Sequence, residues 1–474
     1  MSFWRELMTL DCLSMLISNI ENGDENCFFE NNINEIKVSA QTLDLIKDII
    51  STVEEINFAR NFIETSLEAS SPSFILHRHE GVRCSVYFSY MIDNNTNIMF
   101  NRVKDLDFVI IQHVTSCDFV YFPTLNYLSS MAHFQPLSAH TVLSRLRDNS
   151  DISGKFKEST KINPKFKGFI LSHGRPYHFF YDTVNGVQKL YEEGLIGVVP
   201  HYQMKTGAYI DFTKIYGLKV PNSVLTFNEL NHISDDGNPI FFKVGYVFNK
   251  SKPRVVELVK RFDNILINSI NINNIIYHSY RQILDIKEQG GYLLWASIST
   301  EKRALLNQVD FIGKLLERFE TKQKLCVVID GWTSAHADES MKLKQIQSDL
   351  KVFAEISELY PEVQFFSTIG AESLKKVAIA MLIDFHISSA GTGSLWTSRI
   401  VKKPGVLHCS NAFRSNAIGG HLHYNSAYLP KDTIVDESSA GLRKDFVSYD
   451  LDINKALEFI QIKYADIIPI KLLI

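Results

Sequence analysis

The chain has 474 residues, in which 49 Lys and Arg face 53 Asp and Glu and leave a formal net charge of −4. This length exceeds one ordinary hydrophobic core and predicts two or three domains. Hydrophobic residues make up 45% and charged residues 22%, proportions that are typical of a globular protein and exclude disorder, collagen or a coiled coil as the main state. The slightly acidic balance disfavours a nucleic-acid binder that relies on a basic field.

The six cysteines include no C-x-x-C pair, so they predict neither a zinc knuckle nor a thioredoxin-type redox site, and their scarcity favours reduced thiols in a cytosol. No window approaches the ~20 apolar residues of a membrane helix. Glu6 and Asp11 interrupt the apolar stretch that a signal peptide would have. The apolar stripe from Phe3 to Ile17 favours a core-packed helix, with a membrane-surface helix as the alternative. We expect a cytoplasmic protein with at most peripheral contact at the inner face of the membrane.

The chain up to about residue 280 predicts a mixed α/β domain with a helical extension at its N-terminus. Its predicted elements are a helix at 40–67, strands at 108–114 and 118–122, an exposed connection at 147–167, a strand at 168–172, a helix at 177–193, a strand at 240–247 and a helix at 253–270. Pro123 closes the second strand because proline cannot donate to a ladder. Pro176 fits the first turn of its helix, and Gly194 supplies the stop.

From residue 281 to 474, short apolar strands alternate with helices. The predicted strands are 292–298, 325–329, 363–367, 384–388 and 405–408, and the predicted helices are 301–319, 339–359, 372–382, 394–401 and 453–464. Strands separated by helices require parallel pairing with right-handed crossovers. The strands lack a polar face, as expected when helices cover both sides of the sheet. We therefore predict a doubly wound parallel sheet of Rossmann type.

Small residues fill the stretch Ser388-Ser389-Ala390-Gly391-Thr392-Gly393-Ser394, which links a predicted strand to a helix. Ligands of open α/β sheets bind at the carboxyl ends of strands, and free N–H groups at a helix start favour phosphate. The stretch is neither a Walker A loop nor a dinucleotide fingerprint, because no Gly-Lys-Ser/Thr follows and Trp396 takes the third glycine position. We expect a phosphate-binding loop, with a tight turn before a capped helix as the alternative.

Two other strand ends in this half carry polar side chains. Ser297 and Ser299 follow the first strand, and Ser299 or Thr300 is expected to cap the next helix. That arrangement would bring Arg303 to the same rim, where it could pair with a diphosphate. Asp330 follows the second strand and opens a rim loop with an aromatic side chain. The alternatives are an ordinary cap, a surface arginine and a hydrophobic plug.

A dense polar cluster follows the predicted strand at 168–172. It contains His173, Arg175, Tyr177, His178 and Asp182. His178 and Asp182 are four residues apart and share one face of a helix. A histidine oriented by an aspartate is a suitable general base, and His173, which leaves the strand directly, is an equal candidate. The alternative is a capped helix start with solvated polar side chains.

No metal site is predicted. His77 and His79, like His421 and His423, form a pair without a third ligand at a known spacing. Asp105-Leu106-Asp107 resembles the Asp-x-Asp that holds a metal–diphosphate in other transferases, but it precedes its strand instead of following it. The absence of a Gly-x-Ser-x-Gly elbow disfavours an α/β-hydrolase.

The segment 384–394, followed by Lys403-Pro404-Gly405-Val406, resembles the late donor-site loop, helix and next strand of GT-B glycosyltransferases. Bacterial enzymes that build capsule, O-antigen or lipopolysaccharide are the nearest likeness. The resemblance covers roughly 290–465 and is architectural before that. It implies two Rossmann-like domains facing across a cleft: an acceptor-side domain at 1–280 and a nucleotide-sugar domain at 281–474, whose last helix crosses back. The family's frequent Glu-x(7)-Glu motif is absent, which disfavours a retaining mechanism.

The resemblance implies an inverting, metal-independent sugar transfer to a hydroxyl of a glycan or lipid-linked glycan, without a cofactor. His173 or His178 would deprotonate the acceptor, Asp182 would orient the base, and Arg175 and Tyr177 would contact the acceptor. The residues expected to hold the donor are Ser297, Ser299, Arg303, Asp330, Ser389, Gly391, Thr392, Gly393 and Ser394.

Two other functions stay open at this point. A nucleotide-sugar epimerase can share the architecture and would act without an acceptor. A non-catalytic protein that binds a sugar-nucleotide or a partner would show no turnover. A nicotinamide dehydrogenase is less well supported, because the early Gly-rich fingerprint is missing.

Overall fold

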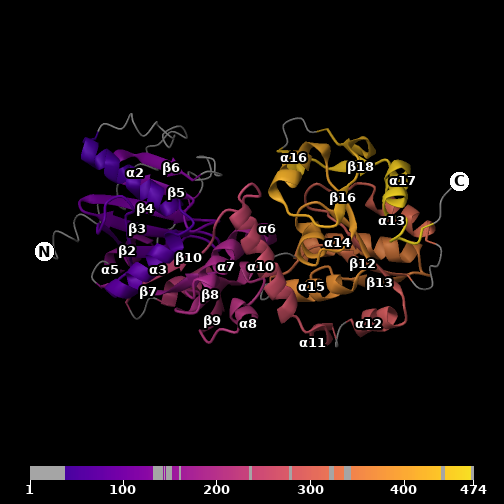
Figure 1. The fold of residues 1–474 in the computed structure, drawn as a ribbon, viewed down its shortest axis with the longest axis horizontal. Helices are drawn as coiled ribbons and strands as arrows, with labels where there is room; N and C mark the ends of the chain where they lie inside the picture. Colours follow the sequence, from indigo (N-terminus) through magenta and orange to yellow (C-terminus); the bar gives the residue numbers. More distant parts are fainter. Residues whose placement is uncertain are drawn as a thin grey trace. The chain divides into compact units, whose positions relative to one another are not determined.

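The computed structural model describes residues 38–131, 142, 145, 152–159, 162–233, 237–276, 280–319, 325–335, 343–438 and 443–470. The chain divides into two compact units whose boundary lies between Val247 and Phe248 (Figure 1). Residues 248–280, which the sequence analysis placed in the N-terminal domain, lie in the C-terminal unit. The apolar stripe from Phe3 to Ile17 lies outside the described residues.

The N-terminal unit contains a six-stranded antiparallel sheet in which the strands follow chain order. Its strands are β1 (Ser73–Ile75), β2 (Arg83–Met91), β3 (Asn97–Val103), β4 (Leu106–Gln112), β5 (Phe119–Phe122) and β6 (Tyr127–Ser130). The sequence predicts only β4 and β5, since polar residues interrupt the apolar pattern of the others. Asn97 and Asn101 are buried in β3, where their amides donate to the carbonyl oxygens of Phe241 and Met99.

The second sheet of this unit is parallel, with the order β10-β7-β8-β9. Its strands are β7 (Pro164–Ile170), β8 (His201–Met204), β9 (Asn222–Leu225) and β10 (Asn238–Lys243). The sheet grows outward from β7 through β8 to β9, and the chain then returns to the other side of β7. The winding direction therefore reverses between β7 and β10.

Helices of the N-terminal unit follow the prediction only in part. They are α2 (Ala40–Glu54), α3 (Phe58–Ala69), α5 (Ile152–Ser159), α6 (Pro176–His178), the π-helix η3 (Phe179–Thr183), α7 (Val184–Glu192), α8 (Phe212–Tyr216) and α9 (Phe227–His232), with 3-10 turns η2 (Pro123–Leu125) and η4 (Lys205–Gly207). The single helix predicted at 40–67 is two helices, because Glu55 takes an extended conformation. The exposed connection predicted at 147–167 is wrong for its described part, which holds α5 and the start of β7. The helix predicted at 177–193 is confirmed and stops at Gly194, whose φ is +74°.

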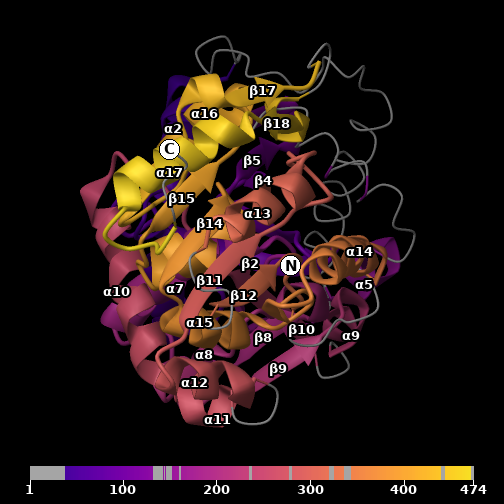
Figure 2. The same cartoon turned by 90° about the vertical axis from the view of Figure 1, so that its right-hand side faces the viewer.

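The C-terminal unit is built on a six-stranded parallel sheet with the order β13-β12-β11-β14-β15-β16. Its strands are β11 (Tyr292–Ser297), β12 (Leu325–Asp330), β13 (Gln364–Ser367), β14 (Phe385–Ser389), β15 (Gly405–His408) and β16 (Ser426–Tyr428). Figure 2 shows the middle strands side by side. The order is that of a doubly wound sheet, with the reversal between β11 and β14. The predicted α/β class is confirmed for this unit, whereas β16 was not predicted.

Helices of the C-terminal unit cover both faces of this sheet. They are α10 (Pro253–Ser269), α11 (Ile272–Ile276), α12 (Arg281–Glu288), α13 (Gln308–Glu317), α14 (Leu343–Leu359), α15 (Ser373–Leu382), the π-helix η8 (Leu395–Ile400), α16 (Asn411–Gly420) and α17 (Ile453–Tyr464), with 3-10 turns η7 (Thr392–Ser394), η9 (Lys431–Thr433) and η10 (Lys444–Phe446) and a two-stranded ribbon of β17 (Ile434–Asp436) and β18 (Tyr449–Leu451). Helix α13 packs against α14 and α17, while α15 packs against α12 and η8. The predicted last helix matches α17, but α13 begins seven residues after the predicted start at 301.

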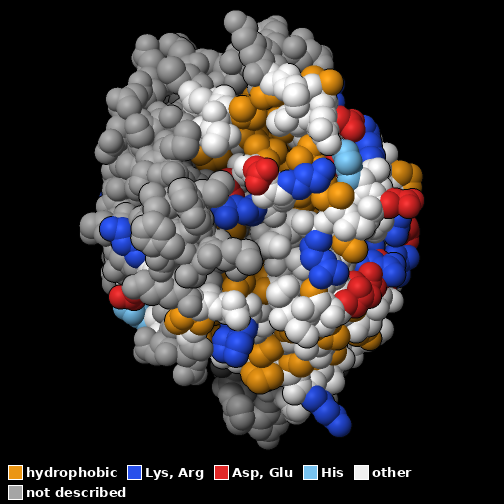
Figure 3. All heavy atoms as spheres, turned by 90° about the vertical axis from the view of Figure 1, so that its left-hand side faces the viewer, with side chains coloured by type: hydrophobic (Ala, Val, Ile, Leu, Met, Phe, Trp, Pro, Cys, Tyr) orange, Lys and Arg blue, Asp and Glu red, His pale blue; other side chains and the backbone are white. Residues whose placement is uncertain are grey.

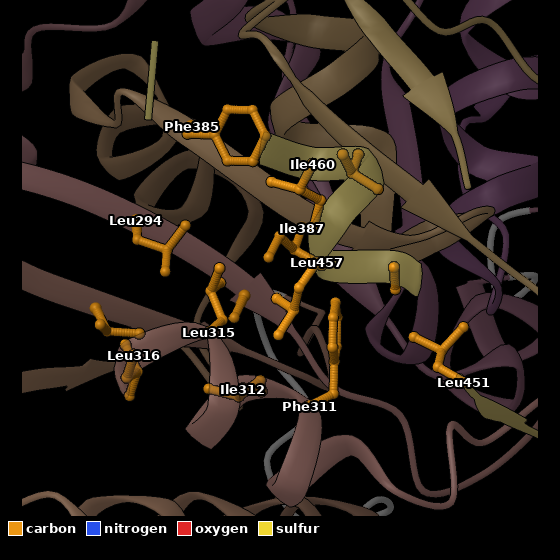
Figure 4. Close-up of a cluster of buried hydrophobic side chains, with 14 of the residues drawn as sticks. Leu294, Phe311, Ile312, Leu315, Leu316, Phe385, Ile387, Leu451, Leu457 and Ile460 are labelled. Carbon is orange, nitrogen blue, oxygen red and sulfur yellow. The ribbon is translucent and has the colours of Figure 1, made fainter. Parts of the chain in front are cut away.

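Alternate side chains of β11 enter different cores. Leu294 and Ala296 belong to the same hydrophobic cluster as Leu315 of α13 and Leu457 of α17. Figure 4 shows Leu294 and Leu315 together in this cluster. Trp295 points to the other face and is fully buried. This period of two is the geometry of a strand buried on both sides.

The surface and the thiols agree with a globular chain. Among the described residues, no helix is both long enough and apolar enough to cross a membrane. The face of the N-terminal unit in Figure 3 mixes basic, acidic and hydrophobic side chains over its described part. The four cysteines that the structure describes are free and buried, as predicted; they are Cys84, Cys117, Cys326 and Cys409.

A buried ion pair joins α10 to η8. Arg399 donates from Nε and Nη2 to the two carboxylate oxygens of Asp263 at 3.1 and 2.9 Å. Both side chains are fully buried. The two parallel hydrogen bonds give this pair a fixed geometry.

Replacing Arg399 by Met should lower the free energy of unfolding by about 3–5 kcal/mol, because it leaves the Asp263 carboxylate buried without its cation. Urea unfolding followed by tryptophan fluorescence measures the change. Arg281→Met is the matched control, since Arg281 pairs with Asp285 at 2.9 Å on the surface and should cost under about 1 kcal/mol. Equal stability of the two variants would contradict a structural role for the buried pair.

Candidate functional site

The reversal between β11 and β14 brings two predicted loops together at the carboxyl edge of the C-terminal sheet. Ser297 ends β11 and Ser389 ends β14. The backbone N–H of Ser389 donates to Ser297 Oγ at 2.8 Å. A Cβ added to Gly393 would lie 3.0 Å from the same Ser297 Oγ. The crevice of an open α/β sheet is expected at this edge, so both loops lie where a ligand would bind.

The Gly-rich loop has a backbone that only glycine adopts readily. Gly391 has φ +127° and ψ −131°. Its N–H donates to Ser394 Oγ at 3.2 Å, and that hydroxyl donates back to the Gly391 carbonyl at 3.1 Å. The loop continues through the 3-10 turn η7, which contains Thr392, into the π-helix η8, where an ordinary helix was predicted. Small side chains therefore leave the backbone of this loop open to close approach.

Arg303 reaches the Gly-rich loop from the segment after β11. Its Nη2 lies 3.3 Å from the position of a Cβ on Gly391. The guanidinium carbon lies 4.2 Å from the ring centroid of Phe413. Burial lowers the pKa of Arg303, and its buried Nε bonds to none of the described residues. A guanidinium held by an aromatic ring beside an open backbone is suited to a phosphate.

The route to this position differs from the prediction. Residues 299–307 form an irregular segment, in which Arg303 itself has φ +48°, and α13 begins only at Gln308. Ser299 is therefore no helix cap: its hydroxyl donates to the Lys302 carbonyl at 3.0 Å. Thr300 donates to Asp349 of α14 at 2.6 Å, so it is no cap either. Arg303 thus reaches the carboxyl edge of the sheet from an irregular segment with a left-handed residue, and not from a capped helix start.

Asp330 lies at the neighbouring strand end but is part of the core. It is 1% exposed, and Lys376 Nζ donates to its Oδ1 at 2.5 Å. Thr368 Oγ1 donates to the same oxygen at 2.9 Å. These partners give Asp330 a structural ion pair that ties β12 to α15, which separates it from the other predicted donor residues.

The polar cluster of the N-terminal unit contains an oriented imidazole. His178 ends α6, and its Nδ1 lies 2.7 Å from Asp182 Oδ2 in η3. The side chain of His178 is 35% exposed and that of Asp182 only 6%. Because a carboxylate only accepts, Nδ1 carries the proton and Nε2 keeps a lone pair. This is the arrangement of a histidine base with an orienting aspartate.

His173 has a different environment from His178. It is 3% exposed, and its Nδ1 accepts the backbone N–H of Arg175 at 3.0 Å. Its proton must therefore lie on Nε2, which is buried and bonds to none of the described residues. Burial lowers the pKa of His173 well below its ordinary value. Arg175 is exposed, and Tyr177 is half-buried. The ring centroid of Tyr177 lies 5.2 Å from that of His178.

Sequence reasoning missed two members of this cluster. The ring of His113, just after β4, lies 5.9 Å from that of His173. Lys243, the last residue of β10, donates to the Ser172 carbonyl at 2.7 Å. Both are remote in sequence from His173, and a lone histidine or a lysine in a strand carries no local signal. The pairing of β10 with β7 brings Lys243 beside His173, whereas His113 comes from the end of β4 in the antiparallel sheet.

His77 and His79, one of the two histidine pairs considered as metal ligands, each lie beside a carboxylate. His79 Nδ1 lies 2.7 Å from Asp48 Oδ2 and His77 Nδ1 lies 3.0 Å from Glu55 Oε1. No group of three His, Cys, Asp or Glu within the part of the chain that the structure describes could hold a metal ion.

Comparison with known proteins adds no assignment. No protein-family model matches the chain, and no curated protein matches it.

The C-terminal unit should lose stability in mild acid. Burial lowers the pKa of four histidines, to about 3 for His386 and His421 and to about 4 for His408 and His423. In the unfolded chain, where the histidine pKa is near 6.5, these side chains bind protons at a pH at which the folded unit does not. The histidine contribution is therefore intact above about pH 6.5 and falls with pH below it, by at most ~1.4 kcal/mol per pH unit for each histidine.

Urea unfolding of a Trp4→Phe chain between pH 7.5 and 5 measures this loss. The remaining tryptophans, at 295, 332 and 396, all lie in the C-terminal unit. A His423→Gln variant should show a shallower pH dependence than its parent. A free energy of unfolding that stays constant or rises on acidification would refute the assignment.

Proposed function

We propose that the chain is a glycosyltransferase that moves a sugar from a nucleotide-sugar to a hydroxyl of a glycan or other acceptor. The C-terminal unit would bind the nucleotide-sugar, and the N-terminal unit would supply the base, in the two-domain GT-B manner that the sequence resembles. The observation that carries the proposal is the position of Arg303 beside the Gly391 backbone at the switch point of the parallel sheet. A bacterial surface-polysaccharide pathway and an inverting stereochemistry remain parts of the proposal.

The donor phosphates would lie beside Arg303 and the Gly-rich loop. The guanidinium supplies positive charge and N–H donors, and the hydroxyl of Thr392 adds a polar contact. The Ser394 hydroxyl is buried and already donates to the Gly391 carbonyl. As the bond between the anomeric carbon and the phosphate oxygen breaks, its electron pair moves to that oxygen. Arg303 stabilises this developing charge, which supports a reaction without a metal.

His178 is the better of the two candidate bases. Its Nε2 lone pair would take the proton of the acceptor hydroxyl while the oxygen attacks the anomeric carbon, and Asp182 would stabilise the resulting imidazolium. His173 carries its proton on Nε2 and engages Nδ1 with the backbone, so it lacks an available lone pair. Arg175 and Tyr177 lie at the same helix start and remain the proposed acceptor contacts.

Replacing Arg303 by Gln should weaken nucleotide binding by roughly 10- to 100-fold, since a charged hydrogen bond to phosphate contributes about 1.5–3 kcal/mol. Isothermal titration with UDP, GDP, dTDP and CMP, and with their sugar conjugates, identifies the donor and gives the affinities. Gly391→Ala should weaken the binding of the same nucleotide, because the added Cβ would lie against Arg303 Nη2 and the backbone at this position would be strained.

Arg318→Gln, at the other end of α13, is the matched control and should leave the affinity unchanged. Unchanged nucleotide affinity in Arg303→Gln would exclude the phosphate site. If NAD binds and none of the sugar-nucleotides does, a dehydrogenase is favoured instead.

With the donor known, His178→Gln should lower turnover by 100-fold or more and leave donor affinity unchanged. Asp182→Asn should lower turnover as well, because the amide no longer holds the Nδ1–H tautomer. Release of the nucleotide in the presence of a panel of glycan acceptors measures the rate. Full turnover in His178→Gln would show that the base is another residue, and donor binding without any turnover by the wild-type chain would favour a non-catalytic protein.

A further inference from the structure

A lysine that the proposed reaction does not use lies at the switch point of the N-terminal parallel sheet. Lys243 is fully buried at the end of β10. Its ammonium donates to the Ser172 carbonyl, one residue before His173, at 2.7 Å, and its backbone N–H donates to Gln112 Oε1 at 3.0 Å. An apolar side chain would join the strands at lower desolvation cost, so the buried charge calls for an explanation.

Three imidazoles stand beside this lysine in a defined order. The ring of His173 lies 4.7 Å from that of His178 and 5.9 Å from that of His113. His113 Nδ1 lies 2.7 Å from Thr96 Oγ1, whose own proton goes to Asp93 at 3.2 Å, so His113 carries its proton on Nδ1. The outer rings thus keep Nε2 lone pairs, and the central ring is an Nε2–H donor.

The carboxylates around the cluster favour one buried cation. The acidic groups that face it are Asp93 from the β2–β3 turn, Asp118 before β5 and Asp182 from η3, and the other cations are Arg145 and Arg175. Burial raises the pKa of Asp118 to about 6 although its carboxylate accepts backbone N–H groups of His113, Val114 and Thr115. Arg145 pairs with Asp93 at 2.6 Å from an exposed position, and Arg175 is exposed.

Lys243 supplies this buried positive charge in place of an imidazole. Burial lowers its own pKa to about 8, and the charges of Asp118 and Asp93 oppose this effect. Burial also lowers the pKa of His113 to about 4, with the Lys243 charge as the next cause. For His173 the causes after burial are the charges of His178 and Lys243. One ammonium in the cluster therefore disfavours a second cation at either ring.

We propose that Lys243 is a positioning residue for the candidate base: it supplies the buried cation of the cluster and anchors the chain beside His173, so that His173 stays a neutral Nε2–H donor next to His178. The inference rests on the proposed role of His178. A protonated His173 ring 4.7 Å away would repel the proton that His178 takes from the acceptor. Lys243 thus preserves the basicity of a ring that it does not touch.

Histidine-ring NMR of the full chain, labelled with 13C and 15N in histidine, tests the charge assignment without any need for turnover. His173→Gln and His113→Gln assign the two signals. In the wild type, both rings should stay neutral from pH 8 to 5, with the proton of His173 on Nε2 and that of His113 on Nδ1. In Lys243→Met, the His173 ring should become protonated within this window, because the ring loses a neighbouring positive charge and the buried carboxylates lose their cation.

Lys155→Met is the matched control. Lys155 is half-buried in the same unit and donates to the Asn231 carbonyl at 3.2 Å, so its loss should leave both signals at their wild-type positions. Lys243→Arg, which retains the charge, should behave as the wild type. Unchanged ring titrations in folded Lys243→Met would overturn the proposal. If that variant does not fold, a wild-type His173 that is charged at pH 7 or protonated on Nδ1 would overturn it as well.

The same outcomes separate this proposal from the glycosyltransferase proposal. A neutral His173 that becomes charged without Lys243 supports the lysine role even if no sugar-nucleotide binds. If the wild-type chain turns over its substrate and the His173 ring titrates identically in the wild type and in Lys243→Met, only the proposed role of Lys243 is rejected.

Discussion

A parallel strand can be followed by another only through a crossover, and right-handed crossovers cover opposite faces when the sheet grows in opposite directions. This constraint organises both units. In the N-terminal unit the direction changes between β7 and β10, and in the C-terminal unit it changes between β11 and β14. In open α/β sheets, ligands bind where the strand order reverses in this way. The His173 cluster lies at the first reversal, and Arg303 with the Gly-rich loop lies at the second.

The sequence predicted five of the six strands of the C-terminal parallel sheet because each of these five is a short run, mostly apolar, that alternates with helices. The Gly-rich loop and the place of Arg303 followed from position relative to those strands, even though the predicted helix cap at Ser299 was wrong. Strand β3 of the antiparallel sheet escaped prediction because the buried amides of Asn97 and Asn101 donate to backbone carbonyls and interrupt the apolar strand pattern. His113 and Lys243 could not be predicted for another reason: only the tertiary structure brings them to His173, Lys243 through the pairing of β10 with β7 and His113 from the antiparallel sheet.

Buried polarity is unevenly used in the two units. In the C-terminal unit, Arg399 with Asp263 and Lys376 with Asp330 are charged pairs in which each ion has its partner at hydrogen-bond distance. Such pairs hold helices to the sheet and contribute little to net stability compared with apolar packing, while their disruption is costly. In the N-terminal cluster, Lys243 is bonded to a carbonyl and balanced by carboxylates that are not its hydrogen-bond partners. That looser balance is what allows its charge to act on neighbouring rings.

Each candidate site loop runs directly into a π-helical segment, η3 after His178 and η8 after the Gly-rich loop. A π turn holds one residue more than an α turn, so α6 before η3 and α7 after it differ in phase by the ~100° that one residue represents. The loop at His173 can therefore present its side chains at an angle independent of α7, which anchors it. In a lineage, such a segment can absorb a one-residue insertion or deletion, so loop length and substrate preference can diverge while α7 keeps its packing.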